Sequence, residues 1–149
     1  MKSRAKGSTQ VTVYEPETYE QPADGPRLNQ VRLVETFQGD VEGQGTARVL
    51  QAQWTDGDVR YTTIERVIGT LGNRKGTFLL QVEGTVRAKH NHGVWKVLAG
   101  SGTGGLSGLR GEGGLSVLWA LPRRRGQHPG VRRPARLPDG PGERARGTP

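Results

Sequence analysis

Two glutamates stand in rows of residues that are otherwise apolar. Glu35 belongs to the alternating row that contains Val31, and Glu65 belongs to the row that contains Val67. Because side chains alternate between the two faces of a β-strand, both carboxyl groups are expected to point toward the apolar face. Two carboxyl groups that face one cavity would have raised pKa values and could act as general acid and base. Glu35 and Glu65 are therefore the candidate catalytic residues.

A structural role for the two glutamates is the alternative that we favour. A β-bulge would turn one of them outward, or each would pair with an arginine such as Arg48 or Arg66 near the strand ends. Structural ion pairs perturb carboxyl groups as catalytic sites do, so the pattern alone does not separate the two roles.

Two histidines follow Gly84 at the spacing that opens a cupin metal motif. His90 and His92 complete G-x5-H-x-H, but Lys96 and Val97 stand where the acidic ligand would be. A stable metal site uses three or four ligands, so we expect a polar hairpin turn here and no metal. The chain has no cysteine, which excludes thiolate metal sites and disulfides.

Three glycines have the spacing of a dinucleotide-binding turn. Gly100, Gly102 and Gly105 give G-x-G-x-x-G. Such a turn needs a following helix, whose N-terminus binds the pyrophosphate. Residues 106–114 contain too many glycines to sustain a helix. We therefore expect no cofactor, and instead a glycine-rich hairpin of two short strands at the rim of a barrel.

The elements that position these residues have the pattern of β-strands. β-Branched and aromatic residues alternate with polar ones, and turns rich in glycine and Asx residues separate the segments. The expected strands lie within residues 9–15, 29–43, 45–54, 58–71, 76–88 and 93–100. Long strands joined by short turns form an antiparallel meander, and closure into a barrel covers its apolar face. The expected fold class is all-β, a small antiparallel β-barrel.

Three motifs carry a resemblance to a known family. They are FQGDVEGQGTA from residue 37, ERVIGTLGNRKGTFLLQ from residue 65 and GSGTGGLSGLRGEGG from residue 100. Together they resemble the bacterial domain-of-unknown-function family 3224, whose members are similar to allene oxide cyclase barrels. The resemblance covers about residues 9–114. It implies a barrel with an internal cavity and implies no particular reaction.

The positive charge of the chain is concentrated near its C-terminus. Of the net charge of +8, residues 115–149 contribute +6, with eight arginines, no lysine and six of the nine prolines. A disordered, arginine-rich tether would bind nucleic-acid phosphates without reading their sequence. We favour translation out of frame, because the family continues with a further strand and these residues correspond to GC-rich codons.

This composition predicts how the chain is divided. We expect a flexible N-terminus over residues 1–8, a barrel over residues 9–121 and a disordered tail over residues 122–149. Without its family's last strand the barrel is expected to be incompletely closed, with an exposed edge that favours a homo-oligomer. No apolar run is long enough for a membrane span and no secretory signal is evident, so we expect a cytoplasmic protein with no membrane partner.

The function that these patterns favour is binding of a small apolar or amphipathic molecule inside the barrel. The inward rows mix large and small residues, which leaves room for one small ligand. The expected lining residues are Phe37, Tyr61, Glu65 and Val67. Two alternatives stay open: an isomerase or cyclase acting in this cavity through Glu35 or Glu65, and nucleic-acid association through the tail.

Overall fold

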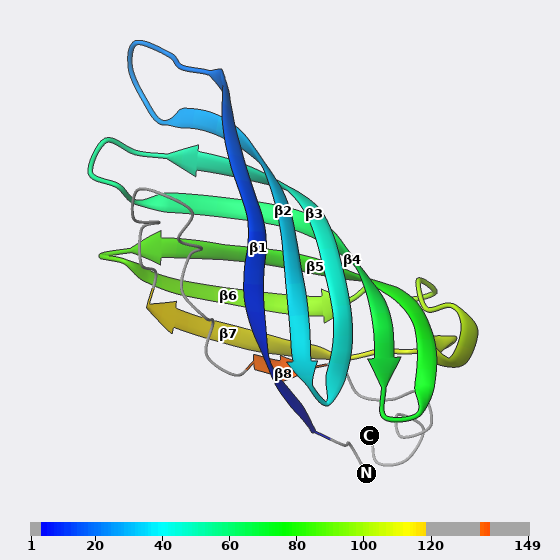
Figure 1. Cartoon of the computed structure of the whole chain (residues 1–149). Helices are drawn as coiled ribbons and strands as arrows, with labels where there is room; N and C mark the ends of the chain where they lie inside the picture. The colour runs from blue at the N-terminus through cyan, green and yellow to red at the C-terminus, as the bar shows by residue number, and fades with distance from the viewer. Residues whose placement is uncertain (1–3, 119–134, 138–149) are drawn as a thin grey trace.

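The computed structural model describes residues 4–118 and 135–137, which form one strongly curved antiparallel sheet (Figure 1). The strands are β1 (Ala5–Glu20), β2 (Arg27–Gly39), β3 (Val41–Gln53), β4 (Val59–Leu71), β5 (Arg74–Arg87), β6 (His90–Val97), β7 (Glu112–Leu118) and β8 (Ala135–Leu137). Their order in the sheet is β7-β6-β5-β4-β3-β2-β1-β8. The described part of the chain contains one 3₁₀-helix, η1 (Gly104–Leu106), so the all-β prediction is confirmed.

The sheet is not closed by a complete ladder. The short β8 pairs with β1, from Ala5 opposite Leu137 to Gly7 opposite Ala135. It also lies near β7, but no ladder between β7 and β8 is present among the described residues. The expectation of an incompletely closed barrel is thus confirmed. Apart from β8, the predicted tail over residues 122–149 lies outside the described residues.

The first strand begins at Ala5, earlier than the expected boundary at Thr9. Two hydrogen bonds hold its start against the turn between β2 and β3. The Lys6 backbone N–H donates to the Asp40 carboxylate at 2.6 Å, and the Asp40 N–H donates to the Lys6 carbonyl at 2.9 Å. Asp40 therefore anchors a residue within the segment 1–8, which was expected to be flexible.

A row of glycines allows the sheet to bend. Gly43, Gly69 and Gly76 are cross-strand neighbours in β3, β4 and β5. A Cβ atom on Gly43 or Gly69 would overlap the backbone of the opposite strand. The absence of side chains thus permits the close approach of the strands at a tight bend.

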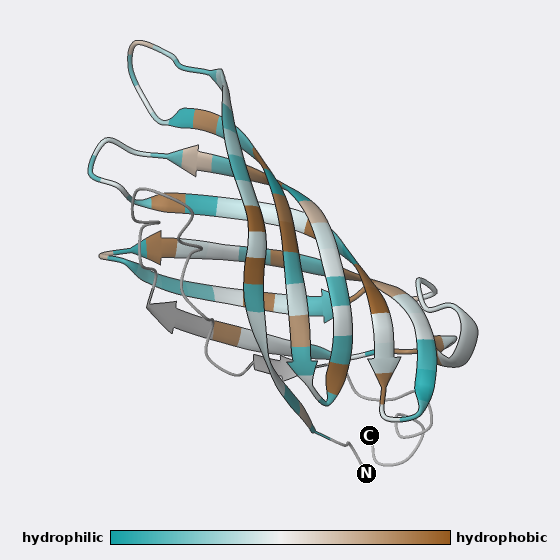
Figure 2. Ribbon diagram, viewed as in Figure 1, coloured by the Kyte–Doolittle hydropathy of each residue, from teal (hydrophilic) through white to brown (hydrophobic). Residues whose placement is uncertain are grey.

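Apolar residues alternate with polar ones along the strands, as the colour bands of Figure 2 show. The larger cluster of buried apolar residues fills one end of the barrel. It comprises Ala5, Phe37, Val41, Val67, Phe78, Leu80, Val82, Trp95, Val97, Leu106 and Leu109. We call this the packed end. No helix in the described residues is both long and apolar enough to cross a membrane.

The glycine-rich stretch covers the packed end, and the expected hairpin of two short strands is wrong. It is the loop 98–111, which contains η1 and leads from β6 into β7. The Thr103 N–H donates to the Thr77 carbonyl at 2.8 Å, and the Leu79 N–H donates to the Ser101 hydroxyl at 3.0 Å. The loop therefore continues the pairing of β5 beyond the end of β6. A Cβ atom on Gly102 would overlap the Leu106 carbonyl, so this glycine permits close packing within the loop.

Candidate functional site

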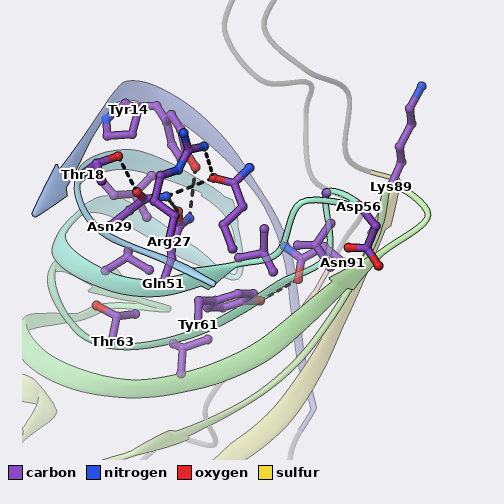
Figure 3. Close-up of a pocket in the computed structure, with 18 of the residues that line it drawn as sticks. Tyr14, Thr18, Arg27, Asn29, Gln51, Asp56, Tyr61, Thr63, Lys89 and Asn91 are labelled. Carbon is purple, nitrogen blue, oxygen red and sulfur yellow. Dashed lines mark hydrogen bonds between the residues drawn. The ribbon is translucent and has the colours of Figure 1, made fainter. Parts of the chain in front are cut away.

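A cavity of about 780 Å³ occupies the end of the barrel opposite the loop 98–111. The turn between β3 and β4 and the turn between β5 and β6 stand at its mouth, where Asp56 and Lys89 are exposed (Figure 3). Aliphatic side chains form part of its wall. They are Leu33, Val49, Val59, Val82 and Val86. We call this the cavity end.

Polar side chains from β1, β2 and β3 form a hydrogen-bonded network on one side of the cavity (Figure 3). The Arg27 Nη2 donates to the Gln53 Oε1 at 2.6 Å. The Asn29 Nδ2 donates to the same oxygen at 3.1 Å and approaches the Gln51 Oε1 at 3.4 Å. The Gln51 Nε2 in turn donates to the Tyr14 hydroxyl at 3.1 Å. We call this set the amide network.

The arginine sets the orientation of the amides. Because a guanidinium has only donors, the side-chain oxygen of Gln53 must face Arg27. That oxygen also accepts from Asn29, so the amide nitrogen of Asn29 points to Gln53. The oxygen of Asn29 then accepts the Thr18 hydroxyl at 2.8 Å. One cation therefore decides which group each neighbouring amide presents.

Tyr61 lies across two glycines on the opposite side of the cavity. In the strand register Tyr61 faces Gly84, and Gly84 faces Gly93. A Cβ atom on either glycine would collide with the tyrosine hydroxyl. The hydroxyl reaches Asn91 and donates to its Oδ1 at 2.6 Å. Gly84 thus makes room for an aromatic ring.

Both candidate catalytic glutamates point inward. Glu65 is 3 % exposed and lines the cavity, and Glu35 is 1 % exposed. A Cβ atom on Gly45, the cross-strand neighbour of Glu35, would overlap the Glu65 carboxyl group and the Phe37 ring. The Glu65 carboxyl group therefore lies over Gly45 of β3, the residue that pairs with Glu35 of β2. It stands at the inner limit of the cavity.

Among the described residues, the structure shows neither an outward turn of these glutamates nor a pairing with the two arginines named for it. The irregularity near Glu35 lies in β1, between Val11 and Val13, and leaves Glu35 buried. Arg48 and Arg66 are exposed on the outer face of the sheet, so among the described residues they form no ion pair with the inward carboxyl groups. Alternation alone, without a compensating bulge, decides the direction of these side chains.

The four expected lining residues are divided between the two ends. Tyr61 and Glu65 line the cavity. Phe37 and Val67 belong to the packed end, with 5 % and 0 % exposure, and do not line it. Alternation explains why all four point inward. Their position along the barrel axis depends on which end of each strand lies at the loop 98–111, and alternation does not contain that information.

The amide network was not predicted from the sequence, although the sequence contains a signal for it. Arg27 and Asn29 continue the alternation of Val31 in β2, and Gln51 continues that of Val49 in β3. Among the residues expected to face inward, the only charged ones were Glu35 and Glu65, and the rows were not followed as far as Arg27, Asn29 and Gln51. Polar residues that continue an inward row indicate a lined cavity rather than a packed core.

The two histidines lie on the outer face of β6. The rings of His90 and His92 are stacked, with centroids 6.2 Å apart, and both residues are exposed. No group of three or more histidine, cysteine, aspartate or glutamate side chains that could hold a metal ion occurs in residues 4–118 and 135–137.

Comparisons with known proteins agree with the resemblance. A family model described as a protein of unknown function, DUF3224, matches residues 5–118. The chain is also similar to a crystal structure of a protein with unknown function from the DUF3224 family of Shewanella oneidensis MR-1. The two are 28% identical with a TM-score of 0.70, and the match covers 93% of this chain and 96% of that chain. No curated protein matches.

Proposed function

Since this chain belongs to the DUF3224 family, a family of unknown function, we propose a function from the cavity itself: the barrel binds a small amphipathic molecule. The observation that carries the proposal is a cavity of about 780 Å³ with an aliphatic wall and a localised polar network. Sites for small ligands have volumes of roughly 300–1,000 Å³ and combine apolar walls with a few placed polar groups.

Binding of the neutral fluorescent probe Nile red tests this proposal with a matched pair of variants. Val86 lines the cavity, whereas Val94 is 59 % exposed on the outer face. Val86→Trp should fill part of the cavity and weaken probe binding about tenfold or more. Val94→Trp should bind as the natural chain does. Failure of the natural chain to bind the probe, or equal binding by both variants, would contradict the proposal.

Proton transfer in the same cavity is the second candidate function, as in an isomerase or cyclase. The buried Glu65 carboxyl group at the cavity wall favours it, with Glu35 behind. An isomerisation changes the structure of its substrate and leaves the molecular mass unchanged. Molecules that co-purify with Glu65→Gln should then match those from the natural chain in mass but differ in chromatographic retention. Identical retention would leave binding alone as the function.

We further propose that the barrel is of the allene oxide cyclase kind and that the chain after Gly114 is translated out of frame. The composition of residues 115–149 supports the second point. A one-base shift near the Gly114 codon should then encode a strand-like end with aromatic and acidic residues. Nucleic-acid binding through the tail is the alternative. A cytoplasmic location, a bacterial source and a homo-oligomer stay predictions.

A further inference from the structure

Arg27 carries a positive charge that no described residue neutralises. It lines the cavity, and within residues 4–118 and 135–137 no carboxylate lies within ion-pair distance of it. Its Nε is buried and has no acceptor in this part of the chain. A partly buried cation without a counter-ion and a buried donor without an acceptor are both unfavourable. An anionic group in the cavity would satisfy both.

The amide network cannot supply that acceptor. The Gln53 Oε1 already accepts from both Arg27 and Asn29, and the Asn29 oxygen accepts from Thr18. The Gln53 amide nitrogen makes no hydrogen bond within the described residues. The network therefore uses its oxygens internally and leaves donors beside Arg27, which favours a ligand group rich in acceptors.

The other charges of the cavity lie elsewhere. Asp56 and Lys89 stand at the mouth, across from Arg27 (Figure 3). Glu65 lies at the inner limit of the cavity. The Asp56 carboxylate accepts the Asp58 N–H at 2.9 Å, so it is engaged in its own turn. These four lining groups balance in formal charge, and none of the acids neutralises Arg27.

We propose that the ligand carries a single carboxylate, bound at Arg27, and an aliphatic body that lies against Leu33, Val49 and Val82. This inference rests on the proposed function and names the ligand class for the same cavity. A guanidinium matches the planar carboxylate in geometry and charge. A phosphate monoester carries nearly two negative charges at neutral pH, and Arg27 alone would not balance it.

Displacement of Nile red by dodecanoate and by dodecanol, at neutral pH and on the full chain, tests the inference. The two competitors share an aliphatic body and differ in the charged head. Dodecanoate should bind about tenfold or more tightly than dodecanol, as expected for a charge-assisted hydrogen bond. Arg27→Gln should remove this preference, so that the two competitors displace the probe at similar concentrations. Arg27→Lys keeps the charge without the planar fork and should retain part of the preference.

Arg66→Gln is the matched control, because it removes the same charge from the exposed outer face. It should keep the full preference, and thermal melting should show each variant folded. Equal affinity for the two competitors, or a preference that survives in Arg27→Gln, would overturn the inference while ligand binding stands. If neither competitor displaces the probe, the inference fails, whereas the proposed function is decided by the comparison of Val86→Trp with Val94→Trp.

Discussion

At the packed end, the inward positions of the strands carry aromatic and aliphatic side chains, and Phe78 is 1 % exposed beneath the loop 98–111. At the cavity end, inward positions of β2 and β3 carry Arg27, Asn29 and Gln51 instead. The same alternation points both sets inward. Apolar side chains can close-pack without further partners, whereas amides and a guanidinium must first satisfy their hydrogen bonds. A change of residue type along one inner face thus separates a core from a cavity.

The largest expected effect is on the free energy of unfolding, in a comparison of two leucine-to-alanine variants, one at the packed end and one at the cavity end. Leu106→Ala should lower the free energy of unfolding by about 3–5 kcal/mol, because Leu106 is fully enclosed and its loss leaves a sealed void. Leu33→Ala should cost about 2 kcal/mol, because the space it vacates joins an existing cavity. Urea denaturation of both variants measures the difference. Equal losses would mean that the two ends are packed alike.

A smaller effect should follow from filling the space beneath Tyr61. Gly84→Ala would place a methyl group against the Tyr61 hydroxyl and the His92 carbonyl, and should cost about 1–3 kcal/mol. In Gly114→Ala the added Cβ meets only the Gly93 carbonyl, at 3.4 Å, and stability should change by less than about 0.5 kcal/mol. Thermal melting compares them. A neutral Gly84→Ala would show that the ring has room to move.

The smallest effect on stability is expected from an exposed ion pair that does not line the cavity. The Arg32 guanidinium hydrogen-bonds Glu15 at 3.2 Å, and this contact lowers the pKa of the Glu15 carboxyl group below its ordinary value of 4.5. Because its pKa is lowered in the fold, the ionised carboxyl group stabilises the fold at pH values above its ordinary pKa. This stabilisation disappears as the pH falls through the lowered pKa. Both side chains are largely exposed, so the gain should be small.

Denaturation midpoints of the natural chain and Glu15→Gln, at neutral and at strongly acidic pH, measure this contribution. The natural chain should have a slight advantage at neutral pH and none at acidic pH, where the carboxyl group is protonated. An advantage that persists in acid would assign the effect to packing of the side chain rather than to its charge.

Alternation predicted most of the strands and the direction of their side chains. Glu35 and Glu65 point inward as their positions in the rows indicate, and turns rich in glycine and Asx residues separate the strands. The position of the cavity was only half predicted, through Tyr61 and Glu65. Phe37 and Val67 were misplaced because alternation reports the face of a strand and not the depth along it.

The amide network shows why the rest required the tertiary structure. Its members come from three strands and meet only after pairing sets their register, with Arg27 opposite Gln53 and Asn29 opposite Gln51. Which amide oxygen faces which nitrogen depends on a guanidinium contributed by another strand. No local pattern contains that information.

The sequence by itself determined the all-β class and the direction of inward side chains, because these follow from local alternation and from backbone propensity. Only the tertiary structure decided that the loop 98–111 covers one end and that a cavity lined by Arg27 occupies the other. Both depend on cross-strand register and on contacts between residues far apart in the chain, such as Thr77 with Thr103.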